Sequence, residues 1–522
     1  MYPLQGLFAI VFLFAGGLDL LAQVPDAAPP PRPDFPARVL GPKSANQPQS
    51  NASQASNVAP PASYDSLPNA LPARNSVVEG NGQPVQSQEN AEPASPATDA
   101  TGVPPGDATG QTFWTRPTFT GDWLGLRPRL QEQGIRFDGN VAQFGFGLGG
   151  GITRTLPLVP ALGLGDTAAY TGRGDYGLTF DLDKFGGMPH GKLQIRAQHW
   201  WGQYGNVSLN TGSFPPAIFP ASIPPVPNDA GVPYITDFVL TQPLSKNWVV
   251  FAGKKNVIGA ADQDDFAGGN GTSQFMNQAF IANPAFLLAL PYSSFTAGFV
   301  SPREWGSFGA FVYDPQDRTQ NFFKLDDLFS QGVIVGGEVK VKSNFFGLPG
   351  EHHVGGLWKH LQMTDLRFNE PAPGQYPYQA VTGFATLWDA YTIYYGFDQY
   401  LQTYCDNPQR GWGLFGRASI SDGNPTPVRY FLSLGIGGYS PIRQHRGDTF
   451  GAGFYYVGTS REFGPLPRAL FGPREGWGME VFYNFQINPW MNFTPDFQVI
   501  RPEAGAIAKT AYIGGVRLNL KF

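Results

Sequence analysis

The feature that most constrains this fold is a regular alternation of apolar and polar residues that recurs along the C-terminal four-fifths of the chain. In the segment 512–522 nearly every second side chain is apolar, and most of the residues between them are polar. The apolar face carries Tyr512, Val516, Leu518, Leu520 and Phe522, and the polar face carries Arg517, Asn519 and Lys521. A period of two residues predicts a β-strand whose two faces meet different environments.

The same alternation appears in the segments 176–183, 192–201, 333–342 and 479–487. It fits either a half-buried sheet of a soluble protein or the wall of a barrel that faces lipid on one side. Both architectures therefore remain open at this point: an array of soluble β-sandwiches and a membrane barrel.

Three observations favour the barrel. No segment after residue 22 is long and apolar enough for a membrane-spanning helix, and aromatic pairs such as Trp200-Trp201 and Tyr455-Tyr456 lie at strand ends, as in interfacial girdles. The chain also ends on an amphipathic strand whose last residue is Phe522. At roughly 25 residues for each strand with its connection, the segment from Phe113 to Phe522 holds about 16 strands. The prediction is an all-β protein, a transmembrane antiparallel β-barrel of about 16 strands.

The N-terminal region has a different composition. Residues 1–22 form an apolar run that resembles a secretory signal peptide with cleavage near Ala22, although no basic residue precedes Arg32; a retained anchor helix is the alternative. Residues 23–112 are rich in Pro, Ala and Ser and almost free of aromatic residues. Such a segment has little to bury, so we expect a disordered N-terminal extension. Residues 113–522 are predicted to form the barrel domain.

Composition and motifs exclude several other classes. The single Cys405 excludes a disulfide framework and a multi-cysteine metal site, and a net charge of −5 does not suggest nucleic acid as a partner. Gly145, Gly147 and Gly150 match a dinucleotide-binding pattern, but no helix is expected after them. Glu351-His352-His353 follows Gly350 and is interpreted as a turn rather than a metal site. We therefore expect no enzyme activity, no cofactor and no bound metal.

Several motifs in order along the chain resemble the carbohydrate-selective porins of the OprB family. The resemblance begins at Thr120-Gly121-Asp122-Trp123 and covers essentially 118–522. Each motif alone is weak, but their combination is specific. After the opening motif at Thr120 to Trp123, the matching motifs are Leu182 to Gly187, Gly253-Lys254, Gly396 to Gln399, Gly416-Arg417, Trp490 with Pro495 to Ile500, and the final Phe522. The chain departs from the family in having Leu124 where Gly is common and in its long Pro-rich extension.

This resemblance implies a sixteen-stranded barrel in the bacterial outer membrane that admits sugars by facilitated diffusion, often as a homotrimer. It also implies insertion into outer-membrane lipid by the barrel assembly machinery, which recognises the terminal aromatic strand. A pore for sugars needs groups that replace the hydrogen bonds between sugar and water without holding the solute too long. Arginine and carboxylate side chains on the inner wall supply such groups.

Candidate pore residues follow from the strand faces. Arg196 lies on the polar face of its segment and is predicted to line the lumen; a wall residue paired with an acidic neighbour is the alternative. Lys254 and Lys255 cannot both point inward, and Lys255 is the candidate because Lys254 shares the face of Trp248 and Val250. Arg417, on the face of Phe415, is predicted to be a lumen charge.

The long turn-rich segment 256–292 is predicted to fold into the barrel and form a constriction, with an extracellular cap as the alternative. It contains Asp262, Asp264, Asp265 and Asn277, which would contact sugar hydroxyls opposite Arg196 and Arg417. Solvated loop charges are the other interpretation of these residues. Together these features predict a passive channel for neutral sugars; a general or differently selective porin and a soluble carbohydrate-binding β-protein remain as alternatives.

Overall fold

A computed structural model describes residues 111–153, 167–203, 206–221, 232–257, 262–321, 324–367, 386–404, 407–445 and 447–522. The predicted signal peptide (1–22) and nearly all of the predicted extension (23–112) lie outside the described residues, and so does Cys405.

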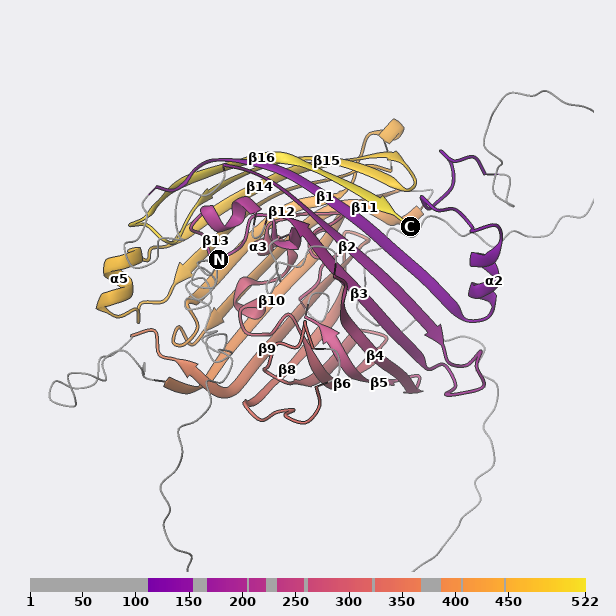
Figure 1. The fold of residues 1–522 in the computed structure, drawn as a ribbon, viewed down its shortest axis with the longest axis horizontal. Helices are drawn as coiled ribbons and strands as arrows, with labels where there is room; N and C mark the ends of the chain where they lie inside the picture. The colour runs from indigo at the N-terminus through magenta and orange to yellow at the C-terminus, as the bar shows by residue number, and fades with distance from the viewer. Residues whose placement is uncertain are drawn as a thin grey trace, which may run out of the picture.

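Sixteen strands form one closed antiparallel barrel, in which each strand pairs with its neighbours in sequence and β1 also pairs with β16 (Figure 1). The strands are β1 (Ile135–Ile152), β2 (Ala168–Asp181), β3 (Lys192–Gly202), β4 (Tyr234–Ser245), β5 (Trp248–Asn256), β6 (Ser293–Arg303), β7 (Gly306–Tyr313), β8 (Gly332–Phe345), β9 (Leu348–Thr364), β10 (Thr386–Tyr404), β11 (Asn407–Ser421), β12 (Val428–Tyr439), β13 (Thr449–Thr459), β14 (Gly476–Asn488), β15 (Met491–Arg501) and β16 (Ala508–Lys521). The predicted fold class is confirmed.

The two ends of the barrel differ in their connections. At one end, which we call the short-turn end, the segments 246–247, 304–305, 346–347 and 489–490 join neighbouring strands. At the other, the loop end, the connections include the long segments 257–292, 314–331 and 460–475. Outer-membrane barrels carry short turns on the periplasmic side and longer loops outside, so the loop end corresponds to the extracellular side.

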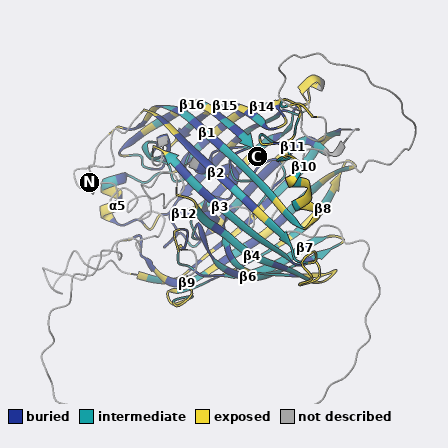
Figure 2. Cartoon of the chain, turned by 45° about the vertical axis from the view of Figure 1, so that its right-hand side comes forward, coloured by how far each residue is buried: buried dark blue, intermediate teal, exposed yellow. Residues whose placement is uncertain are grey.

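Alternation along the strands separates an inner from an outer surface. On β1, Phe144, Phe146 and Leu148 are buried against Ile218 and Met276, which belong to connections inside the barrel. The outer positions of other strands expose large apolar side chains, among them Leu434, Phe454, Val481 and Phe497. Figure 2 shows the resulting bands of buried and less buried residues along the strands. The outer face is apolar, as contact with lipid requires, whereas the inner face of β1 is apolar because it packs on these connections.

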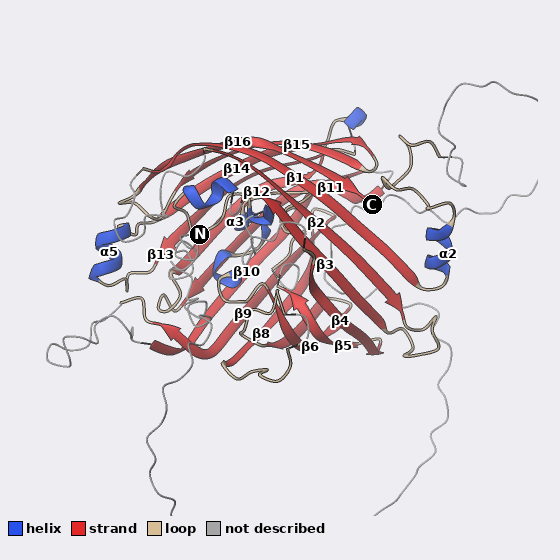
Figure 3. Cartoon of the chain, in the orientation of Figure 1, coloured by secondary structure: helices blue, strands red, loops and turns tan. Residues whose placement is uncertain are grey.

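The helices are short. Helix α2 (Leu126–Glu132) lies at the short-turn end and α5 (Pro465–Phe471) at the loop end, while α3 (Gln278–Ile281) and α4 (Pro284–Leu287) belong to the segment between β5 and β6 (Figure 3). None of the described helices is long and apolar enough to cross a membrane.

Two segment predictions can be compared with this architecture. The segment 512–522 has the predicted faces, because Arg517, Asn519 and Lys521 pair with the inner positions of β1. The interpretation of Glu351-His352-His353 as a turn is wrong: all three lie in β9, and the turn of the hairpin is at 346–347. Gly350, on which the turn interpretation rested, is itself part of β9.

The C-terminus closes the barrel. The backbone N–H of Phe522 donates to the carbonyl of Gly139 at 2.8 Å, and its ring packs edge to face on Phe119, with 5.5 Å between ring centroids. The ring of Phe119 in turn contacts Trp490 at 5.1 Å. These aromatic contacts join the segment that precedes β1 to the end of β16 at the barrel seam.

Replacing Phe522 by Ala should lower the stability of the folded barrel by about 1–2 kcal/mol, because an edge-to-face pair and part of a buried ring are lost. The measurement is the temperature at which the compact band converts to the unfolded band on a gel run without boiling. Phe185→Ala, an exposed ring in the turn between β2 and β3, is the control and should leave that temperature unchanged. Equal conversion temperatures for all three proteins would contradict the prediction.

Candidate functional site

The connection between β5 and β6 enters the lumen and is held there by the inner wall. Its backbone N–H groups donate to wall carboxylates: Asp262 to Glu338 on β8 at 2.9 Å, and Asp265 to Asp398 on β10 at 3.0 Å. Further along, the N–H of Met276 donates to Glu480 on β14 at 2.7 Å. Because the acceptors lie on widely separated strands, these contacts place the segment across the inside of the barrel, as predicted, rather than over its rim. We call the described part, 262–292, the inner loop.

Arg417 on β11 is the centre of the attachment. Its guanidinium lies 2.8 Å from a carboxylate oxygen of Asp264 and 3.4 Å from one of Asp262, and all three side chains are fully buried. It also donates to the backbone carbonyls of Phe280 at 2.9 Å and Ala267 at 3.0 Å. A guanidinium can satisfy several acceptors at once, which suits it to fixing a loop on a wall.

His353 on β9 completes this cluster. Its ring nitrogens lie 3.2 Å from Asp262 and 3.6 Å from Asp264. Although the cluster combines a histidine with two carboxylates, no group of His, Cys, Asp and Glu side chains in the described part of the chain is arranged to hold a metal ion. We call Arg417, His353, Asp262 and Asp264 the loop anchor.

The two carboxylates of the loop anchor differ electrostatically. Burial raises the pKa of Asp262, but Arg417 and His353 outweigh that effect and hold the pKa below its ordinary value. For Asp264, burial dominates over the same two partners and raises the pKa to about 6. Asp262 also accepts a hydrogen bond from the backbone N–H of Asn283, so its ionised form is the better supported one.

A second anchor lies on β14 to β16, and the sequence did not indicate it as a site. Arg517 donates to the carbonyls of Gly271 at 2.8 Å and Gln274 at 2.7 Å. Beside it, Glu480 and Asp496 interact with each other, and Glu480 accepts the N–H groups of the inner loop. Arg517 had been placed on the polar face of the last strand, so the inward direction was visible in the sequence, but its loop partners were not.

Asn277, a predicted pore residue, has a structural role in the inner loop. Its side-chain oxygen accepts the N–H of Ala279 at 3.0 Å and so caps α3, and its amide nitrogen donates to Gln498 at 3.1 Å. It is fully buried. Asp265 is half-buried and accepts a hydrogen bond from the hydroxyl of Tyr400 at 3.2 Å.

Arg196 and Lys255 lie on the opposite wall. Strand register places Arg196 of β3 beside Asp237 of β4. Phe238 of β4 pairs with Lys254 of β5, so the preceding Asp237 lies opposite the following Lys255. Arg196, Asp237 and Lys255 therefore share the inner face. Lys254 points the other way and donates to the carbonyl of Asn321 at 3.1 Å. Neither Arg196 nor Lys255 makes a side-chain hydrogen bond or ion pair with a described residue, and the ammonium of Lys255 lies 5.5 Å from the centroid of the Phe251 ring.

The wall of β2 and β3 contributes a further charged pair that sequence analysis missed. Arg173 lies 2.9 Å from Asp175, and both are buried. The side chain of Gln198 donates to Asp175, and the indole of Trp200 donates to the carbonyl of Pro220 at 3.2 Å. Extending the predicted alternation of segment 176–183 toward the N-terminus would have placed Arg173 and Asp175 on the inner face.

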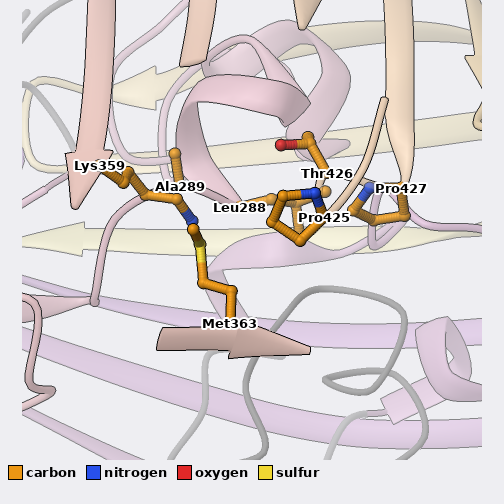
Figure 4. A pocket seen from close by; sticks show the side chains of 7 residues that line it. All are labelled: Leu288, Ala289, Lys359, Met363, Pro425, Thr426 and Pro427. Carbon is orange, nitrogen blue, oxygen red and sulfur yellow. The ribbon is translucent and has the colours of Figure 1, made fainter. Parts of the chain in front are cut away.

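A small pocket lies near the loop end (Figure 4). It is lined by Leu288, Ala289, Lys359, Met363, Pro425, Thr426 and Pro427. Most of these groups are apolar and come from the inner loop and the wall that it packs against. The pocket is therefore a gap in packing beside the inner loop and not a site for a polar solute.

Comparison with known proteins agrees with this architecture. The family model for the carbohydrate-selective porin, OprB family, matches residues 165–522. The chain belongs to this family. Membership places the barrel among the porins of the outer membrane and identifies it as a channel rather than an enzyme. The matched range contains the loop anchor, Arg196 and Lys255.

Two individual proteins show how far the likeness extends. A structure of Pseudomonas putida OprB at high pH superposes with a TM-score of 0.65 at 19% sequence identity, covering 79% of this chain and 100% of that one. This likeness concerns the fold. The Porin AaxA of Chlamydia pneumoniae is 30% identical over 108 residues, which are 20% of this chain. The match spans about a quarter of that relative's length, 24%.

The loop anchor predicts different effects for its two carboxylates. Asp262→Asn should loosen the inner loop at pH 7.5, at a cost of about 3–5 kcal/mol, because Arg417 and His353 lose a buried charged partner. Asp264→Asn should cost less at that pH. Since the folded-state pKa of Asp264 is raised to about 6, ionising it lowers stability as pH rises from about 4 to about 6.

Hydrogen exchange of backbone amides in 262–292 measures both effects. The native protein should lose some protection between pH 4 and pH 6 beyond the intrinsic pH dependence of exchange, and Asp264→Asn should remove that additional loss. Faster exchange in Asp264→Asn than in Asp262→Asn at pH 7.5 would contradict the assignment. A strand amide near Val481 serves as the internal reference.

Proposed function

We propose that the barrel is a passive channel for sugars whose narrowest passage lies between the inner loop and the wall of β3 to β5. Family membership supports a carbohydrate-selective pore. We infer the position of the passage from the unequal distribution of paired and unpaired charges around the lumen. Charged residues of β8, β10, β11, β14 and β16 hold the inner loop, among them Arg417 and Arg517, whereas Arg196 and Lys255 on the opposite wall make no hydrogen bond or ion pair with a described residue.

The chemistry of this wall suits a sugar. Arg196 and Lys255 donate hydrogen bonds to hydroxyls, and the half-buried carboxylate of Asp237 between them accepts. One oxygen of Asp237 already accepts the backbone N–H of Asn256 at 3.2 Å, which fixes its direction. Alternating donors and acceptors replace water around a polyhydroxylated solute without trapping a single ion.

The inner loop contributes half-buried polar side chains of its own, and the carboxylate of Asp265 lies beside the hydroxyl of Tyr400 on β10. Gln263, Asp265 and Gln274 are half-buried, unlike most of the inner loop. Gln274 uses its amide nitrogen to donate to the carbonyl of Asp265 at 3.0 Å, so the two residues are held together. Of the predicted loop carboxylates, we assign solute contact to Asp265. The other predicted residues shape the passage by holding the inner loop: Asp262, Asp264, Asn277 and Arg417.

Three further parts of the proposal concern partners. The exposed apolar belt between the two ends matches the hydrocarbon region of the outer membrane. The terminal strand, with Phe522 at the seam, is the signal that we expect the barrel assembly machinery to use. Association into a homotrimer would be made through the outer surface of the barrel.

The first test is uptake by liposomes that contain the purified protein. Glucose should enter faster than neutral amino acids of similar size, because the wall offers hydrogen-bonding partners suited to hydroxyls. Equal rates for both solutes would contradict carbohydrate selectivity and favour a general porin on the same barrel. Liposomes without protein provide the baseline.

The second test separates the free wall from the loop anchor. Arg196→Ala and Lys255→Ala should each weaken the block of ion conductance by sugar about threefold to tenfold, because each loses about one hydrogen bond to the solute. Amide exchange in 262–292 should stay as in the native protein. Arg417→Ala should instead increase both exchange and conductance, because it releases the inner loop.

An unchanged sugar block in both Arg196→Ala and Lys255→Ala would overturn the position of the passage. Lys184→Ala, which changes an exposed lysine in the turn between β2 and β3, is the control.

A further inference from the structure

The outer surface at the loop end is not uniform around the barrel. On β12 to β16 the outer side chains change in a fixed order from the middle of the barrel toward the loop end. Leu432, Leu434, Phe454, Met479 and Phe497 form an exposed apolar zone. Tyr430, Tyr456 and Trp477 follow, and the residues nearest the loop end are Arg429, Arg461, Arg501 and Lys509. We call these four residues the basic rim.

Aromatic contacts order the zone beneath the basic rim. The rings of Tyr430 and Tyr456 stack with 6.1 Å between centroids and an interplanar angle of 15°. Both hydroxyls donate to the carboxylate of Glu475, at 2.8 Å for Tyr430. On the next strand pair, Trp477 stacks on Phe454. Aromatic girdles of this kind mark the level at which the hydrocarbon of the membrane meets its headgroups.

The basic rim therefore lies at the level of lipid headgroups. Strand register fixes Arg501 directly beside Trp477. Arg461 and Arg501 both lie within electrostatic range of Glu475, but Glu475 is already engaged by the two tyrosine hydroxyls. None of the four residues of the basic rim makes a side-chain hydrogen bond or ion pair with any residue that the structure describes. The exposed guanidinium and ammonium groups of the basic rim can therefore bind anionic groups of the membrane.

The rest of the described loop end has the opposite character. At the ends of β9 and β10, His360 and Trp388 lie beside Asp389, whose carboxylate is 2.9 Å from the histidine ring. In the connection 314–331, Arg318 and Lys324 are both paired with Asp327. Arg318 and Lys324 thus have an acidic partner within the protein, unlike the four residues of the basic rim.

We propose that the basic rim binds the phosphate groups of the phosphorylated glycolipid that forms the outer leaflet of the bacterial outer membrane. The geometry supports a lipid because the charges stand directly above an aromatic and an apolar zone, so that headgroup phosphates and acyl chains are contacted together. Arginine favours this ligand because its fork of donors matches phosphate oxygens. This binding is separate from the passage of sugars, since the basic rim lies on the outer surface.

The test is native mass spectrometry of the full chain in detergent with added diphosphorylated lipid A. The double variant Arg461→Ala/Arg501→Ala should retain lipid A about tenfold less well than the native protein, because charge-assisted contacts to phosphate are lost. Arg303→Ala is the matched control and should bind normally, because Arg303 packs on Trp248 near the short-turn end. Arg501→Lys should recover part of the binding if charge matters.

Two comparisons identify the ligand. Phosphatidylglycerol and inorganic phosphate should each compete poorly with lipid A. Equal competition by either would overturn the assignment to glycolipid, and unchanged lipid A retention in the double variant would overturn the basic rim itself. Heat-modifiable migration on a gel verifies that each variant is folded. If the double variant does not fold, the single variants Arg461→Ala and Arg501→Ala carry the same test.

Discussion

A polypeptide segment that runs inside a barrel must find partners for its backbone N–H and C=O groups on the inner wall, and the rest of this structure depends on how it does so. Carboxylates on β8, β10 and β14 accept N–H groups of the inner loop, and Arg417 and Arg517 donate to its carbonyls. Buried charges are costly unless they are paired and hydrogen-bonded. Here the loop backbone and the wall charges satisfy each other.

This arrangement divides the inner wall into two regions with different roles. Where charged side chains such as Arg417 and Arg517 hold the inner loop, they are hydrogen-bonded to it and buried. On β3 to β5 the inner loop contacts the wall through Tyr292 and Gln198, while Arg196 and Lys255 make no hydrogen bond or ion pair with a described residue. The same logic holds on the outside, where paired charges on one side of the loop end contrast with the basic rim. Only charged side chains that have no partner within the protein remain to bind a ligand.

The sequence predicted the architecture well, because alternation with a period of two is set by the strand backbone itself. The faces of Arg196, Lys255 and Arg517 followed from that alternation and a single reference residue. The residues that contact the inner loop could not be predicted in this way. Nothing in the spacing of Asp262 and Asp264 shows that His353, about ninety residues later in a strand mistaken for a turn, would lie against them. Contacts between an irregular loop and a distant strand depend on register, which local patterns do not encode.

The seam between β1 and β16 has a consequence for biogenesis. Because Asn140 pairs with Lys521, the first strand has no partner on one side until the last strand has been made and delivered. A chain that stops early, even by one strand, keeps two open edges whose unpaired backbone groups cannot be accommodated in hydrocarbon. Closure of the barrel therefore requires the complete last strand.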